Sequence, residues 1–149
     1  MTSPAECLAN ILQTAGVGHT TTPTITAWAL KVSQLADTPD RCIALLDSGG
    51  FTPNPKWLLD FPTVQVIVRG PKQDYSAGYS KGLEVKNALL GISPTTVSNI
   101  RIDGITMLSD LTFIQYDSKD RPLFSLNFRL IQESPVDSLT SRKDLNDVG

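Results

Sequence analysis

The chain has 149 residues, of which 40% are hydrophobic and 19% are charged, and this balance predicts one globular domain rather than a disordered or membrane-embedded chain. Its net charge of −2 and isoelectric point near 5.2 argue against a protein that grips duplex DNA, since such surfaces concentrate Lys and Arg. Two distant cysteines and a single histidine leave too few ligands for a zinc site.

The two cysteines are expected to be buried free thiols, because Cys7 falls on an amphipathic segment and Cys42 in an apolar run. Free thiols suit a reducing compartment. The N-terminus carries no basic region followed by an apolar stretch, and the sequence has no run of about 18 apolar residues. We therefore expect a product that is made in the cytoplasm, stays soluble and has no membrane partner.

A first helix is predicted near the N-terminus. Ser3, Pro4 and Glu6 supply an N-cap, a first-turn proline and a capping-box glutamate. Apolar residues then recur at helical spacing until Gly16, which is expected to end the helix.

Two strands are expected to follow this helix. Residues 24–32 alternate in a way that predicts a strand apolar on both faces, and residues 41–47 predict a second strand. A turn at Asp37, Pro39 and Asp40 separates them. The sequence therefore predicts a hairpin with a loop of several residues.

The stretch from 48 to 61 breaks every periodicity and is predicted to be a long apolar loop. Phe51, Trp57, Leu58 and Leu59 carry more apolar area than a solvated loop needs. Such a loop can dock on a neighbouring subunit or fold over its own core. We expect the part from 49 to 59 to be mobile in the free subunit and to dock.

The clearest strand is 62–69, in which three valines alternate with other residues before Gly70 ends the run. A second helix is predicted over 74–90, with Gly91 at its C-terminal cap. Gly78 and Gly82 weaken that helix by about 1 kcal/mol each relative to Ala, but they also allow another element to approach closely.

From Val97 onward the pattern predicts β-structure only. Asp103-Gly104 indicates a two-residue turn, with a bulge at Gly104 as the alternative. A strand is expected over 113–116 and a last strand over 124–130, joined by a turn at 117–120. Residues 133–149 are predicted to be a flexible polar tail appended to a domain of residues 1–132.

Catalytic signals are weak. His19 lies in a loop without a nucleophile elbow, and the glycines before it are too closely spaced for a phosphate-binding loop and lack its Lys. The acidic residues Asp103, Asp110, Asp117 and Asp120 could hold a hard cation, but each stands beside a predicted turn, where Asp serves the backbone. We predict no catalytic, metal or cofactor site.

Arg69 ends the clearest strand, immediately before Gly70-Pro71. Its guanidinium is placed where a carboxylate could meet it bidentately. That carboxylate could belong to a partner or to an ion pair within the chain.

Two stretches carry a resemblance to a known family. The run from Leu59 to Gly70, LDFPTVQVIVRG, resembles the signature of the phage minor capsid and tail-terminator family, in which a Pro leads a valine-rich strand ending in Arg-Gly. The run from Asp117 to Arg121, followed by Phe124 to Arg129, resembles that family's Asp-rich turn, arginine and closing strand. Relatives often place a Gly in this turn, where the chain has Ser118-Lys119-Asp120.

The resemblance agrees with the fold predicted from the pattern. That fold is α+β, a mixed and mostly antiparallel sheet flanked by two helices, with a long interaction loop and a polar C-terminal tail. The resemblance implies a structural virion protein of the tail and neck that forms a ring, expected to be hexameric, at the head-proximal end of the tail. The ring would end tail-tube polymerisation and present a surface for head joining.

The implied partners are further copies of the chain, the tail-tube protein and a head-tail connector or stopper protein, while DNA passes through the lumen without specific binding. The expected interface residues are Phe51, Trp57, Leu58, Leu59, Arg69 and Arg121.

Other readings stay open at the level of sequence. A head-completion or connector subunit of the neck could share these elements. A small enzyme or ligand-binding domain would need a pocket with convergent polar groups, which the scarcity of His and paired acids disfavours. The charge balance disfavours a nucleic-acid binder.

Overall fold

The computed structural model describes residues 2–20, 27–54 and 59–133. Two helices and six strands make up this part of the chain, and the predicted α+β class is confirmed. In chain order they are α1 (Pro4–Thr14), β1 (Ala29–Val32), β2 (Cys42–Asn54), β3 (Leu59–Arg69), α2 (Tyr75–Leu90), β4 (Thr95–Val97), β5 (Ile100–Tyr116) and β6 (Pro122–Glu133).

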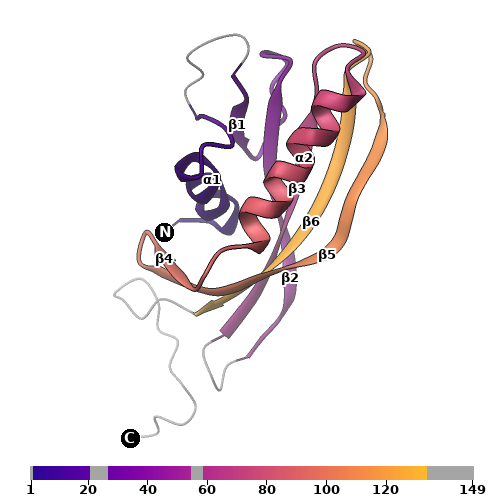
Figure 1. The fold of residues 1–149 in the computed structure, drawn as a ribbon. Helices are drawn as coiled ribbons and strands as arrows, with labels where there is room; N and C mark the ends of the chain where they lie inside the picture. The colour runs from indigo at the N-terminus through magenta and orange to yellow at the C-terminus, as the bar shows by residue number, and fades with distance from the viewer. Residues whose placement is uncertain (1, 21–26, 55–58, 134–149) are drawn as a thin grey trace, which may run out of the picture.

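The six strands form one sheet in the order β1-β2-β3-β6-β5-β4. Only β1 and β2 run parallel, and the other neighbours are antiparallel. Both helices lie against the same face of the curled sheet, and β2 and β3 run on past them (Figure 1). Neither helix in the described ranges is long and apolar enough to cross a membrane.

The core lies between the helices and this face. β3 contributes Val64, Val66 and Val68, and β6 contributes every second residue from Phe124 to Leu130. Each large apolar side chain taken out of water in this way stabilises the fold by about 1.5–3 kcal/mol.

The first helix begins as the sequence predicts. The Ser3 side chain accepts a hydrogen bond from the Glu6 backbone, and the Glu6 side chain accepts one from the Ser3 backbone, which completes the capping box. The Ala5 backbone N–H also donates to the Asp47 carboxylate at 2.9 Å. This contact ties the start of α1 to β2.

The predicted hairpin of residues 24–47 is wrong. β1 and β2 are parallel neighbours, with Ala29 beside Cys42 and Val32 beside Leu45. Parallel neighbours need a connection that returns the chain to its starting end. The prediction failed because contacts far along the chain hold the connecting loop. Residues 24–26 of the predicted strand lie outside the described part.

The predicted loop of residues 48–61 is mostly strand. β2 continues to Asn54 and β3 starts at Leu59, so the two form a long hairpin whose tip, 55–58, lies outside the described residues. The register shifts between Asp47 and Gly50. Gly50 has φ +130°, and a Cβ there would overlap the Phe61 carbonyl oxygen. Glycine thus serves a bulge within a strand instead of ending it.

The second helix and its glycines behave as predicted. α2 is capped by Asp74, whose carboxylate accepts from the Ala77 backbone, and it ends at Gly91. A Cβ at Gly78 would lie 2.6 Å from the Phe124 ring, and one at Gly82 would lie 2.6 Å from Leu111. The glycines therefore let side chains of β6 and β5 press against the helix backbone.

The turn predicted at Asp103-Gly104 is wrong, and the alternative, a bulge, is confirmed. β5 runs straight through as a strand of 17 residues, and its register against β6 shifts between Ile102 and Gly104. The turn predicted at 117–120 is confirmed, since it joins β5 to β6.

Both cysteines are fully buried free thiols, as predicted. Burial raises the pKa of the Cys7 thiol to about 11, with smaller contributions from the Glu6 and Asp47 carboxylates. Burial also raises the pKa of Cys42. Both thiols therefore stay protonated at neutral pH and act as small apolar groups.

Candidate assembly surfaces

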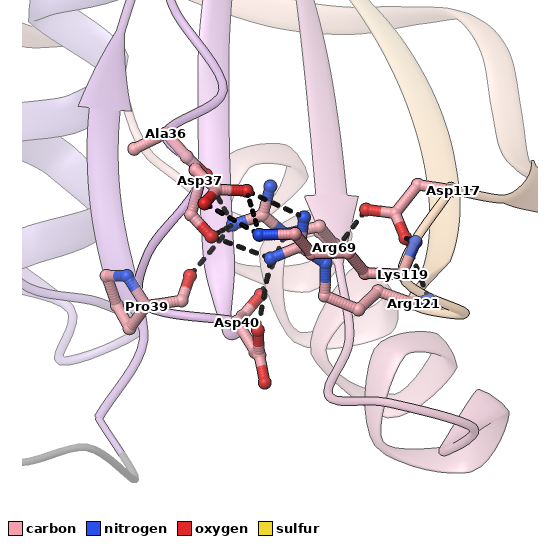
Figure 2. A network of polar contacts seen from close by, with 8 residues as sticks. All are labelled: Ala36, Asp37, Pro39, Asp40, Arg69, Asp117, Lys119 and Arg121. Carbon is pink, nitrogen blue, oxygen red and sulfur yellow. Dashed lines mark hydrogen bonds and ion pairs between the residues drawn. The ribbon is translucent and has the colours of Figure 1, made fainter.

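Two buried arginines meet at one end of the sheet. Arg69 is the last residue of β3, and Arg121 directly precedes β6, the neighbour of β3 in the sheet. Arg69 is 2% exposed and Arg121 is 4% exposed. Arginine is rarely buried to this extent without partners. Figure 2 shows both guanidinium groups facing the loop that joins β1 to β2.

Arg69 binds the backbone of that loop. Its Nε donates to the Asp40 carbonyl at 3.0 Å, and its Nη2 donates to the Pro39 carbonyl at 2.8 Å and to the carbonyls of Ala36 and Asp37. Burial lowers the pKa of Arg69, and the nearby Arg121 lowers it further. Among the described residues no carboxylate pairs with Arg69. Backbone carbonyls take the place of the ion pair within the chain that was one of the two alternatives, and a partner's carboxylate stays a prediction.

Arg121 binds the carboxylates instead. Its Nε lies 2.8 Å from Asp117 and its Nη1 lies 3.0 Å from Asp40, while Nη1 also donates to the Asp37 carbonyl at 2.7 Å. Burial would lower the pKa of Arg121, but the hydrogen bonds with Asp40 and Asp117 outweigh it and raise that pKa. Arg121 thus joins the β5–β6 turn to the β1–β2 loop.

Asp117 organises the turn itself. Its carboxylate accepts from the backbone N–H groups of Lys119 and Arg121, each at 2.9 Å. Burial would raise the pKa of Asp117, but these backbone bonds and the Arg121 guanidinium lower it overall. Turn chemistry, rather than cation binding, accounts for this residue.

The rim of this network faces solvent. Lys119 Nζ lies 2.8 Å from both carboxylate oxygens of Asp37. The hydrogen bond from Lys119, followed by its charge, lowers the pKa of Asp37. The network therefore has a buried part, which stabilises the fold, and an exposed rim, which a partner could contact.

Of the other expected interface residues, Phe51 and Leu59 lie away from this network. Leu59 begins β3 and Arg69 ends it, which separates them by on the order of 33 Å. Phe51 is 53% exposed and its ring lies 5.6 Å from the Arg129 guanidinium, whereas Leu59 is half-buried. Trp57 and Leu58 lie outside the described residues. The four described residues of the expected set thus do not form a single site.

An aromatic cluster near the start of α2 was not anticipated from the sequence. Tyr75 lies 5.3 Å from Phe113 and 5.1 Å from Phe124, and Phe113 lies 5.4 Å from Tyr116, measured between ring centroids. Phe124 is fully buried, while Tyr75, Tyr79, Phe113 and Tyr116 are each more than one-third exposed. The spacing of Tyr75 and Tyr79, four residues apart on a helix, was the available signal.

A groove of about 490 Å³ lies between α1, the end of α2 and β4. Its lining carries no ionisable side chain in the described part of the chain: Asn10, Ile11, Thr14, Ala15, Ala88, Ile92, Ser93, Pro94, Thr95, Thr96 and Val97. Ser93 and the threonines supply hydroxyl groups, but this lining holds no ionisable side chain that could act as a general base for them.

Comparison with known proteins agrees with this picture. The sequence matches the family described as bacteriophage tail terminator protein over residues 11–134. The structure is similar to a chain in the virion of a native gene transfer agent particle, with a TM-score of 0.60 and 14% identity, covering 89% of this chain and 96% of that one. The search of curated proteins gives no match.

The chain is therefore a tail-related structural protein of a virion. More particularly, it belongs to the bacteriophage tail terminator protein family.

Proposed function

We propose that this chain forms a ring at the head-proximal end of the phage tail, where it ends tail-tube polymerisation and offers the surface to which the head joins. The observation that carries the proposal is the family match over residues 11–134. It includes the last turn of α1, all of α2, the whole sheet and the two-arginine network.

The mechanism is geometric and no bond is made or broken. One face of the ring presents the same contact surface that tube subunits present to one another. The other face does not, so the tail tube stops growing there. Head-to-tail contacts that close on themselves produce such rings. We infer a hexamer from the family resemblance alone. Its subunits should fold independently, because a single chain already buries a continuous core.

The proposal assigns four partners to the chain: further copies of itself, the tail-tube protein, a connector or stopper protein, and DNA in transit. A net charge of −2 suits a channel through which DNA slides, because a lumen crowded with Lys and Arg would retain the phosphates. The groove without ionisable lining supports a structural role over an enzymatic one.

The test uses particles that lack the protein. A terminator defect gives overlong tails that are not joined to heads, whereas loss of a neck connector gives tails of normal length. Electron microscopy of such particles distinguishes the two. Purified protein added to polymerising tail-tube protein should also shorten the tubes, and tubes of unchanged length would contradict the proposal.

A further inference from the structure

One edge of the sheet is open along most of its length. β5 is bonded on one side to β6, and on the other side β4 covers only Ile100–Ile102. In the described part of the chain, no strand pairs with the outer side of β5 from Gly104 to Tyr116. The free N–H and C=O groups of such an edge are a template for another strand.

The composition of this edge does not discourage pairing. Natural edge strands are protected by Pro, Lys or other charges, yet the segment GITMLSDLTFIQY carries no Pro, Lys or Arg and has one acid, Asp110. Its pairing with β6 is irregular at several positions. The strand is nevertheless continuous over 17 residues.

The same edge is apolar. Leu108, Ile114 and Tyr116 are 46%, 47% and 45% exposed, and Phe113 is 37% exposed. The exposed rings of Tyr75 and Tyr79 on α2 extend this surface through their contacts with Phe113 and Phe124. Aromatic side chains held rigid in this way are typical anchors of protein interfaces. We name the segment Gly104–Tyr116 together with Tyr75 and Tyr79 the β5 seam.

We propose that the β5 seam binds a second copy of this chain, at the opposite, β1 end of that copy's sheet. The inference rests on the proposed ring and names the surface that closes it. β1 and β5 lie toward opposite ends of one sheet, which is the arrangement that a head-to-tail ring requires. Pairing of two identical seams would give a closed dimer and leave the β1 end unused.

The two edge strands carry charges of opposite sign. Lys31 is the single charged residue of β1, and Asp110 is the single charged residue of the seam. The Asp110 side chain remains 69% exposed although Lys86 lies 3.0 Å away. On the outer side of β1, His19 forms a bridge with Ala29, and the Leu30 N–H donates to the His19 carbonyl. Lys31 and Val32 therefore continue the edge beyond His19 within the described part of the chain.

The first experiment blocks the seam with an edge lysine. Ile114→Lys and Leu108→Lys are compared with Leu90→Lys, a similarly exposed apolar residue at the far end of α2. Sedimentation of the full chain over a range of concentrations should show that both seam variants need about tenfold or more protein to form rings. Leu90→Lys should assemble as wild type, and monomer melting temperatures should be similar in all four proteins.

The second experiment mixes wild-type and Ile114→Lys chains. A head-to-tail contact lets the blocked copy join through its intact β1 end and then prevents closure, so a minority of blocked copies should abolish rings. Rings formed by the seam variants, or simple dilution by the blocked copy, would overturn the inference while the proposed ring stands. If wild-type protein forms no ring with or without tail-tube protein, the proposed function itself fails.

Discussion

Arg69 and Arg121 are equally buried at one end of the sheet but bind different groups. Arg69 binds carbonyl oxygens of the 36–40 loop, whereas Arg121 binds the carboxylates of Asp40 and Asp117. The planar fork of a guanidinium can serve either set, because its N–H groups point in fixed directions. At residue scale the two arginines donate the hydrogen bonds that backbone N–H groups would supply to the 36–40 loop in a regular strand or helix.

Truncating Arg69 should destabilise the subunit. Arg69→Ala leaves several carbonyl groups of the 36–40 loop without their donor, and we expect a loss of about 3 kcal/mol in the free energy of unfolding. Urea denaturation of the monomer measures this loss. Lys119→Ala, which removes an exposed partner of Asp37, is the control and should change stability little. An Arg69→Ala protein as stable as wild type would show that the hydrogen bonds to these carbonyls are dispensable.

The network should also make stability depend on pH. The pKa of Asp117 in the folded state lies below its ordinary value of 3.8. As the pH falls toward and below 3.8, the unfolded chain therefore binds a proton at Asp117 before the folded chain does. The stabilisation is complete above the ordinary pKa and is lost as the pH falls through the folded pKa.

Asp117→Asn tests this linkage. The variant should be less stable than wild type at neutral pH, and the difference should shrink as the pH falls below about 4. Asp37 and Asp110, whose pKa values are also lowered, keep part of the acid sensitivity in both proteins. The unfolding free energy measured between about pH 7 and pH 3 gives the result, and a constant difference would exclude the assigned role.

At element scale, the features that local chemistry determines are predictable from the sequence. The capping box of α1, the Asp74 and Gly91 limits of α2 and the turn at 117–120 follow from signals within a few residues. The parallel β1–β2 pair does not, since Arg69 and Arg121 hold its connecting loop from 29 and more positions away. The sequence predicts a loop at Gly50 and a turn or a bulge at Gly104, because a glycine within a bulge and one within a turn look alike in sequence.

The candidate site was predictable in part for the same reason. Arg69 stands out because its strand is strongly patterned, but its carbonyl partners come from a loop whose path no local signal gives. The aromatic cluster joins α2 to β5 and β6, which are brought together only by the completed sheet. The sequence predicts a docking role for Phe51, but it does not predict its place on a bulged strand.

The fit of α2 on the sheet is sensitive to volume. Gly78→Ala introduces a methyl group 2.6 Å from the fully buried Phe124 ring, so the helix or the ring must shift. We expect a loss of about 1–3 kcal/mol in the free energy of unfolding, although Ala favours helices over Gly by about 1 kcal/mol. Ser80→Ala, an exposed position on the same helix, should be neutral or slightly stabilising. Thermal unfolding compares the two, and a more stable Gly78→Ala would contradict the packing argument.

At the scale of the whole molecule, the exposed features are spread around the sheet rather than gathered in a pocket. The arginine network lies at the end of β3, the β2–β3 hairpin reaches past the helices from the other end, and the β5 seam follows one edge (Figure 1). A ring subunit that must contact neighbours, tube and connector needs separate surfaces of this kind. The described parts of β2 and β3 run on beyond both helices (Figure 1), which makes this hairpin a candidate contact with the tube or with a neighbouring subunit.

This role predicts that Phe51 matters for assembly more than for folding. Phe51 is 53% exposed, and its ring lies 5.6 Å from the Arg129 guanidinium. Truncation of Phe51 therefore removes little from the core. An aromatic anchor at an interface contributes about 2 kcal/mol or more to binding. Phe51→Ala should therefore reduce ring formation or docking on tail tubes while the monomer melting temperature stays near that of wild type. Leu90→Ala, a similarly exposed apolar position away from the hairpin, controls for the general loss of surface hydrophobicity. A destabilised monomer with normal assembly would mean that Phe51 supports the bulged hairpin itself, and the docking role would then pass to another surface.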